Sequence, residues 1–210
     1  MRKILVAAAF GAMLSMSIGA YAAPYASFSA GFFQPANTTV TDDYSTDEVT
    51  LSYKTGGVVS GAVGYRFDNG LRLEEELSYR GADFDKASLA GYNDVDINSK
   101  FTAVAFMTNL FYDIKTESIV SPYFGVGLGT CTVKVDDATF SSGGYSTPGW
   151  YEDDQTVLAY QLGVGLGFNV SQNVTFDVGY RFFGTEDIQF TDYKSTFSSH
   201  AGTVGVRFIF

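Results

Sequence analysis

The chain has one cysteine, one histidine and one tryptophan among its 210 residues. Its 13 lysines and arginines are outnumbered by 23 aspartates and glutamates. Because Cys131 has no internal partner, no intramolecular disulfide holds the fold together. A net charge of −10 has the wrong sign for a protein that binds nucleic acid. After residue 18, no apolar run reaches the ~20 residues of a membrane-spanning helix.

The first residues have the features of a secretory signal peptide. Two basic residues precede an apolar run over residues 4–18, and the small-x-small sequence Ala20-Tyr21-Ala22 follows. This arrangement is typical of a cleaved export signal. We therefore expect residues 1–22 to be a signal peptide and residues 23–210 to form one exported domain, a length that suits a single domain.

The exported part is rich in glycine (23), phenylalanine (19) and tyrosine (14). Its apolar residues alternate with polar or small ones in eight segments of about the ~9–11 residues that a tilted strand needs to cross a bilayer. The segments are 26–32, 59–67, 71–79, 102–112, 124–132, 160–168, 174–182 and 204–210. The pattern predicts an all-β fold, namely a transmembrane, eight-stranded, antiparallel up-and-down β-barrel.

The connections between these segments alternate between short and long. Short ones cover 68–70, 115–121 and 171–173, and long ones cover 34–56, 83–99, 136–155 and 185–199. Outer-membrane barrels have short periplasmic turns and longer extracellular loops. We therefore expect location in the cell outer membrane, with four long extracellular loops and both chain ends in the periplasm.

Charged residues lie on the opposite face of each segment. An arginine that faces lipid at mid-depth costs about 2–4 kcal/mol, so these side chains are expected to point into the lumen. The predicted lumen charges are Arg66, Arg72, Glu74, Glu76, Arg80, Asp113, Asp177, Arg181 and Arg207. Side chains just fill the interior of an eight-stranded barrel, which predicts a closed, charge-filled lumen; the alternative is a small-solute porin with a narrow water path.

Repeated glycines share the inward face. Gly-Val-Gly-Leu-Gly occurs at 125–129 and again at 163–167. No helix is expected to follow, as a phosphate-binding glycine loop would require. We expect these glycines to leave room for the lumen arginines and for bulky neighbours such as Tyr123 and Phe183, with Cys131 an inert inward residue.

Glu75 breaks the alternation, because it stands between Leu73 and Leu77 on the apolar face. Either a β-bulge shifts the register, or the carboxyl group faces lipid and is protonated or paired with a neighbouring strand. Acidic residues are penalised less than basic ones on this face. We favour a bulge or a tolerated cost over a functional site.

The candidates for catalysis and cofactor binding are few. Ser198 and His200, with Glu186 and Asp187 nearby, could form a nucleophile and base that attack a lipid ester. A histidine at the barrel rim is an ordinary interfacial residue, so we expect no enzyme, and a lipid hydrolase is the weakest alternative. The acidic residues do not show the Asp-x-Asp-x-Asp-Gly spacing of a calcium loop, and no cofactor is expected.

Most of the acidic residues fall in the long connections. They are Asp42, Asp43, Asp47, Glu48, Asp83, Asp85, Asp94, Asp96, Asp136, Asp137, Glu152, Asp153, Asp154, Glu186, Asp187 and Asp192. A solvated crown of like charge is the simplest interpretation; divalent cations that bridge to anionic lipid, or a basic host surface, are alternatives. Tyr145, Trp150 and Tyr151 are candidate partner contacts, because exposed aromatics suit protein interfaces.

Several motifs resemble the opacity-type surface-antigen family of eight-stranded outer-membrane β-barrels. The motifs are Gly64-Tyr65-Arg66-Phe67, Asn69-Gly70-Leu71-Arg72-Leu73-Glu74, Ser121-Pro122-Tyr123, Gly179-Tyr180-Arg181-Phe182 and Arg207-Phe208-Ile209-Phe210. The resemblance implies an exposed surface antigen with roles in adhesion, envelope integrity or modest porin activity, and we expect the protein to be a monomer. The resemblance also implies that Val206, Phe208 and Phe210 form an insertion signal for the barrel assembly machinery.

Overall fold

The computed structural model describes residues 22–41, 48–89, 95–136, 139–142, 145–148, 153–186, 188–189 and 194–210. The predicted signal peptide up to residue 21 lies outside these ranges, as do Trp150 and Tyr151. Within the described ranges there is no helix that is long and apolar enough to cross a membrane.

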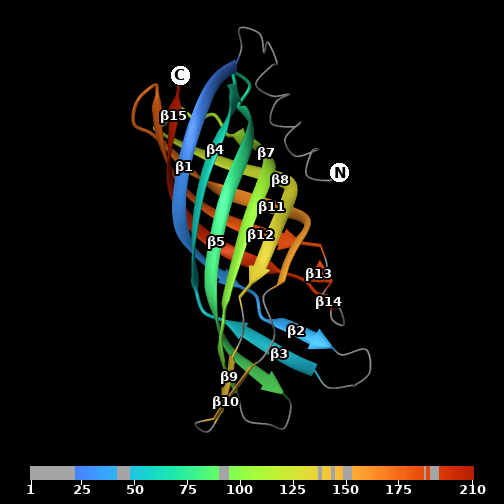
Figure 1. Cartoon of the computed structure of the whole chain (residues 1–210). Coiled ribbons are helices and arrows are strands. Elements are labelled where there is room, and N and C mark those ends of the chain that lie inside the picture. Colours follow the sequence, from blue (N-terminus) through green and yellow to red (C-terminus); the bar gives the residue numbers. More distant parts are fainter. Residues whose placement is uncertain are drawn as a thin grey trace.

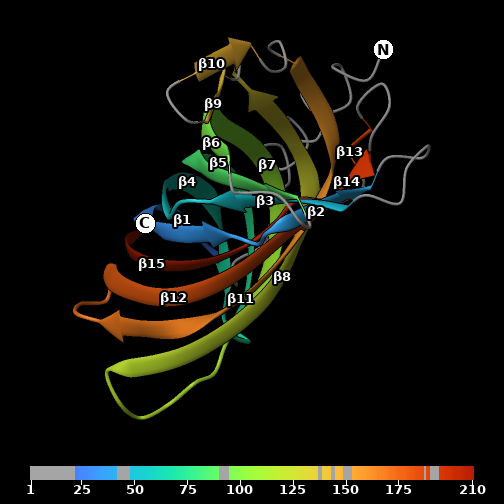
Figure 2. The same ribbon diagram turned by 90° about the horizontal axis from the view of Figure 1, so that it is seen from below.

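Eight antiparallel strands close into a barrel (Figure 1). They are β1 (Ala22–Pro35), β4 (Gly56–Phe67), β5 (Leu71–Leu89), β7 (Lys100–Asp113), β8 (Val120–Val135), β11 (Asp153–Asn169), β12 (Val174–Thr185) and β15 (Ser198–Ile209). Each strand pairs with the next in chain order, and pairing of β1 with β15 closes the ring. In Figure 2, β1, β15, β12, β11 and β8 follow one another along the curved wall. The predicted fold is confirmed, and the eight predicted segments fall in these strands, except that Phe210 lies one residue beyond the end of β15.

Short connections gather at one end of the barrel, here called the turn end, where β15 also finishes (Figure 1). In the turn between β4 and β5, the Gly70 amide donates to the Phe67 carbonyl at 3.0 Å. Gly70 has a φ of 95°, and a Cβ atom there would lie 2.6 Å from the Asp113 carbonyl oxygen. Both facts require glycine at this position.

The opposite end, here called the hairpin end, contains more strands than the sequence predicted. Stretches expected to be loops contain β2 (Thr38–Thr41), β3 (Glu48–Tyr53), β6 (Val95–Asn98), β9 (Thr139–Ser142), β10 (Tyr145–Pro148), β13 (Ile188–Gln189) and β14 (Lys194–Ser195). Beyond the barrel wall, β5 continues and pairs with β3 on one side and β6 on the other. The order β2-β3-β5-β6-β9-β10 forms a sheet that projects from the barrel. Threonine, valine and tyrosine in these segments favour strands.

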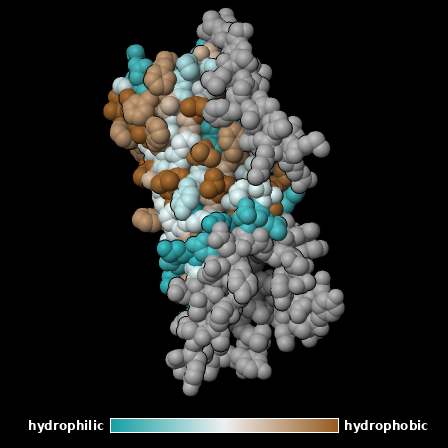
Figure 3. Space-filling view, viewed as in Figure 1, coloured by the Kyte–Doolittle hydropathy of each residue, from teal (hydrophilic) through white to brown (hydrophobic). Residues whose placement is uncertain are grey.

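The outer wall of the barrel is apolar. Phe28, Phe32 and Leu128 expose 63%, 74% and 71% of their surface on it. Figure 3 shows a broad hydrophobic region over the barrel strands and a hydrophilic band toward the hairpin end. An apolar belt of this kind suits contact with lipid hydrocarbon rather than water.

Glu75 lies on this outer face without any bulge. The register runs without a break through Val63, Glu75 and Thr108 on β4, β5 and β7. The Thr108 hydroxyl donates to both carboxylate oxygens of Glu75, at 2.9 and 3.0 Å. The predicted bulge is therefore wrong, and pairing with the neighbouring strand explains how the wall accommodates the carboxyl group.

The inside of the barrel is divided into two halves. Toward the hairpin end it holds an apolar plug, defined here as Phe33, Val58, Ala82, Phe84, Phe101, Ala103, Ala105, Met107, Cys131, Val133, Ala159, Phe183, Phe197 and Ala201. Charged side chains occupy the half toward the turn end. The expectation that charges fill the whole lumen is thus wrong for the hairpin half, where both faces of a strand such as β7 are apolar.

Candidate functional site

Nearest the turn end, Asp113 lies between two buried arginines. The Arg72 Nε donates to both oxygens of Asp113, at 3.0 and 2.9 Å, and the Arg207 Nη1 donates to one at 3.1 Å. Arg207 also forms an ion pair with Asp177 at 2.7 Å. Since β7 and β15 are opposite each other in the ring, the Arg207–Asp113 pair crosses the lumen.

A second layer is centred on two glutamates of β5. Glu74 accepts hydrogen bonds from the Tyr25 hydroxyl at 2.6 Å and from the Asn109 Nδ2 at 3.2 Å. Glu76 pairs with Arg181 on β12, the strand opposite β5. The Gln161 side chain donates to the Asn109 Oδ1 at 2.6 Å and extends this layer to β11. Buried charges are tolerated when they are paired and hydrogen-bonded in this way.

The uncharged members of this layer did not stand out in the sequence. Tyr25, Asn109 and Gln161 are polar residues at positions that face the lumen. Their place in the inward-facing half of the alternating pattern is the sequence signal that could have identified them. Gly127 provides the space for one of them, because a Cβ atom there would overlap the Asn109 Oδ1. Gly165 and Gly179 likewise lie against the Tyr123 side chain, for which the sequence predicted that glycines leave room.

Arg80 lies where the charged half meets the apolar plug, and it is only 1% exposed. Its Nη1 donates to the Ser78 Oγ at 2.7 Å, and its guanidinium carbon lies 4.0 Å from the centre of the Phe183 ring. Among the described residues no carboxylate forms an ion pair with it, and its Nε has no hydrogen-bond partner. Attraction to the aromatic face partly compensates this buried cation.

The nine charged residues predicted to line the lumen therefore differ in their partners. The structure joins Arg72, Glu74, Glu76, Asp113, Asp177, Arg181 and Arg207 in ion pairs. Arg80 is inside but stacks on an aromatic ring. Arg66 is half-buried at the turn end, opposite Arg72 in the register, and no ion pair involves it within the described part of the chain.

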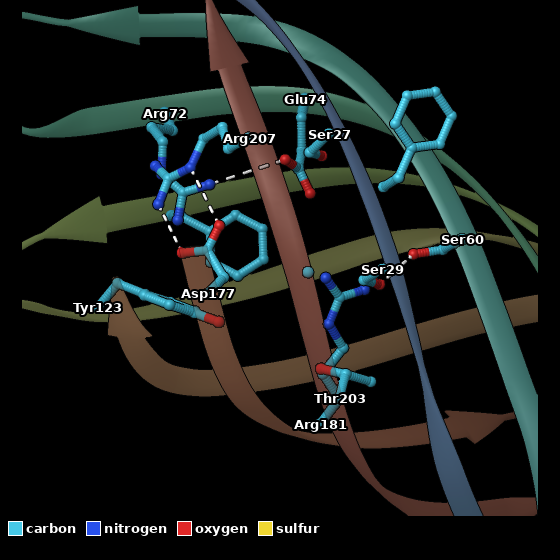
Figure 4. Close-up of a pocket in the computed structure, with 13 residues that line it drawn as sticks. Ser27, Ser29, Ser60, Arg72, Glu74, Tyr123, Asp177, Arg181, Thr203 and Arg207 are labelled. Atoms are coloured by element: carbon cyan, nitrogen blue, oxygen red, sulfur yellow. Dashed lines mark hydrogen bonds and ion pairs between the residues drawn. The ribbon is translucent and has the colours of Figure 1, made fainter. Parts of the chain in front are cut away.

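A small polar cavity remains in the charged half (Figure 4). It measures about 30 Å³, and its walls include Ser29, Ser60, Thr203 and Arg181. This volume holds about two water molecules, at ~10–15 Å³ each. It is too small for an organic cofactor, and the described residues contain no cluster of His, Cys, Asp and Glu that could hold a metal ion.

His200 takes part in an aromatic contact on the outer wall instead of a catalytic arrangement. Its Nδ1 lies 2.5 Å from the Tyr180 hydroxyl, and its ring stacks with the Tyr180 ring and lies tilted against the Phe182 ring. The structure records no hydrogen bond between His200 and Ser198. Glu186 is exposed, and Asp187 lies outside the described residues.

The remaining predicted residues are placed in part. Tyr145 begins β10, whereas Trp150 and Tyr151 lie outside the described residues. Phe208 and Phe210 are 41% and 75% exposed, on the parity of Val206. The Phe210 amide donates to the Pro24 carbonyl at 2.9 Å, which holds the end of the chain against β1.

Comparisons with known proteins agree with this architecture. The sequence profile described as "Outer membrane protein beta-barrel domain" matches residues 4–210. The chain is 24% identical to outer membrane protein PagN of Salmonella typhimurium over 159 residues, which cover 68% of this chain and 66% of PagN. It is 27% identical to opacity protein opA66 of Neisseria gonorrhoeae over 135 residues, covering 54% of this chain and 55% of that protein. The chain thus spans less than two thirds of the length of these relatives.

Among solved structures, Neisserial surface protein A superposes with a TM-score of 0.52 at 20% identity, covering 89% of this chain and 97% of that one. At this identity the likeness concerns the fold alone.

Proposed function

Since the chain belongs to the outer membrane protein β-barrel domain family, we propose that it is a surface-display protein of the outer membrane, with an adhesin-like role. The turn end faces the periplasm and the hairpin end faces the outside. In this proposal the barrel is an anchor, and the projecting sheet with its acidic connections contacts host or matrix proteins.

The observation that carries the proposal is the sheet at the hairpin end. β5 runs from Leu71 to Leu89, well past its pairing with β4, and carries β3 and β6 beyond the barrel wall. A barrel that served only as an anchor would need no such extension. Ordered strands outside the membrane offer a surface on which contact residues are held in place.

The filling of the lumen supports display rather than transport. The charged half is crossed by ion pairs between opposite strands, and the apolar plug follows it toward the outside. A hydrated ion on its way through would meet a layer that consists mainly of buried phenylalanine and alanine side chains. Removing an ion from water in this way is strongly unfavourable.

The surroundings of His200 support a role without catalysis. Its Nδ1 is engaged by Tyr180, so this nitrogen is not oriented toward Ser198 as a nucleophile and base would require. Tyrosine and histidine in this position suit the interface between lipid and water. We therefore propose a monomeric, non-enzymatic barrel whose partners are lipid and proteins at the cell surface.

The end of β15 supports the further proposal that Val206, Phe208 and Phe210 are read during assembly. Their side chains share the outward parity, where a partner could contact them before the barrel closes. Deletion of Phe210 should reduce insertion into the outer membrane, whereas Arg207→Ala should reduce heat stability only. Equal insertion of both variants would contradict this division.

The adhesive role is tested by binding of cells that display the wild-type protein to host cells and immobilised matrix proteins. Deletion of residues 140–151 should abolish or strongly reduce binding without changing the heat-dependent gel mobility of the barrel. A matched control replaces the turn residue Asp68 by asparagine, which changes charge at the opposite end. If cells with the intact protein bind no better than cells without it, the proposal fails.

The closed lumen is tested by conductance in planar bilayers. Wild-type protein, Arg66→Ala and Arg181→Ala should show no steady channel, because the apolar plug remains intact in each. The double variant Phe33→Ala/Phe183→Ala should conduct more readily. A steady wild-type conductance that changes with Arg181→Ala would favour the small-solute pore.

A further inference from the structure

The extracellular sheet ends in a strand with a free edge. In the order β2-β3-β5-β6-β9-β10, the outermost strands are β2 and β10. β14 lies against β2, whereas β10 pairs with β9 alone among the strands that the structure describes. An antiparallel strand directs backbone N–H and C=O groups to both sides. The outer side of β10 therefore presents backbone groups that another strand can pair with.

The residues of this edge give it little protection. Natural edge strands are often guarded by lysine, by an inward charge or by proline within the strand. β9 and β10 read Thr139-Phe140-Ser141-Ser142 and Tyr145-Ser146-Thr147-Pro148, with no charged residue in either. Pro148 occupies only the last position, so it leaves those amides of residues 145–147 that point away from β9 available for pairing.

The sequence that flanks this edge is predominantly acidic. The sequence contains no basic residue between Lys134 and Arg181, but it has acids at 136, 137, 152, 153 and 154. Lys134 already lies 4.0 Å from Asp136. This negative charge attracts basic segments. It disfavours binding of a second copy of the same acidic chain, because like charges across an interface are costly.

We propose that the outer edge of β10 binds an extended, lysine- or arginine-rich segment of a host or matrix protein by strand addition. Backbone hydrogen bonds to β10 provide affinity in this mode, and side chains provide selectivity. The acidic residues that flank the β9–β10 hairpin in the sequence, at 136, 137 and 152–154, would supply the charge opposite to that of the basic segment. The inference rests on the proposed adhesive role and specifies how contact is made.

The test uses the full chain in nanodiscs of zwitterionic lipid and a labelled peptide of alternating lysine and threonine. Three measurements are made: fluorescence anisotropy, hydrogen exchange at residues 145–147, and the same exchange in β15 as an internal reference. The peptide should bind and slow exchange in β10 but not in β15. A peptide of alternating glutamate and threonine should bind at least about tenfold more weakly, because its charges are repelled.

A third peptide separates strand addition from simple charge attraction. It has the same lysine–threonine sequence with N-methyl groups at alternate residues, which remove amide donors and leave the charge unchanged. Strand addition predicts at least about tenfold weaker binding. The protein variant Asp136→Asn/Asp153→Asn/Asp154→Asn should also weaken binding of the unmodified peptide, whereas Asp68→Asn at the turn end should not.

Each contrary result overturns a stated part of the inference. Equal binding of the N-methylated peptide excludes strand addition, and equal binding of the glutamate peptide excludes a basic partner. If the unmodified peptide does not bind at all, the inference is wrong. Cell binding that persists in that case leaves the adhesive role intact, so the two failures are distinguishable.

Discussion

The two halves of the lumen are filled by opposite chemistry within the same eight strands. In the half toward the turn end, arginines and carboxylates pair across the ring, as Arg207 and Asp113 do at 3.1 Å. In the half toward the hairpin end, the buried side chains are mainly phenylalanine, alanine and valine. The first half depends on specific partners and geometry, whereas the second depends on volume and exclusion of water. Substitutions should therefore follow different rules in the two halves.

The largest difference is expected for a new charge. Ala105→Asp places a carboxylate in the apolar plug, where Ala105 is fully buried. An unpaired charge in such surroundings should lower the free energy of unfolding by at least about 3–5 kcal/mol. The matched change Ser29→Asp adds the same group beside the cavity that Arg181 lines, and it should cost much less. Urea unfolding in lipid vesicles measures both; equal losses would show that the halves do not differ in polarity.

Removal of a shared partner should come next. Asp113→Ala leaves Arg72 and Arg207 without their common carboxylate. Loss of one partner from a buried ion pair destabilises by about 3–5 kcal/mol. The control Asp68→Ala removes an exposed carboxylate from a turn and should cost less than about 1 kcal/mol. A small effect of Asp113→Ala on unfolding would mean that water replaces the carboxylate without loss.

In the apolar half the expected loss scales with the space created. Phe33→Ala removes a side chain that is 1% exposed, and such substitutions cost about 3–5 kcal/mol. Phe33→Leu should cost clearly less, because it keeps most of the volume. The same unfolding measurement ranks the two variants. If the leucine variant is no more stable than the alanine variant, packing does not hold this half together.

The smallest change in stability is expected on the outer wall of the barrel, which contains neither the ion pairs of one half of the lumen nor the apolar packing of the other. Glu75→Gln preserves an acceptor for the Thr108 hydroxyl and removes the ability to ionise. Because acidic side chains on this face carry only a modest penalty, stability should change by less than about 1 kcal/mol. Glu75→Lys is the contrasting variant, with an expected loss of about 2–4 kcal/mol at mid-depth. A large loss for glutamine would indicate a functional role for the carboxylate.

Sequence reasoning succeeded where a residue's neighbours along the strand decide its place. Alternation identified the barrel strands, and it assigned Arg72, Glu76 and Arg181 to the inside. It did not identify the apolar plug, because a segment such as 101–107 is apolar on both faces and parity alone cannot tell lipid from core. It also treated the long connections as loops, since short strands like β9 and β10 become ordered only when β5 and β6 provide an edge.

The sequence by itself determined which way the charged residues of the strands point and which end of the barrel carries short turns, because these follow from the two-residue period and from connection length. Only the closed barrel decided the partners across the lumen. Arg207 meets Asp113, and Arg80 lies over Phe183, from strands on opposite sides of the ring. Closure of the barrel fixes the stagger between neighbouring strands. This stagger places residues from distant parts of the sequence at the same height in the lumen, and no local sequence pattern indicates which residues these are.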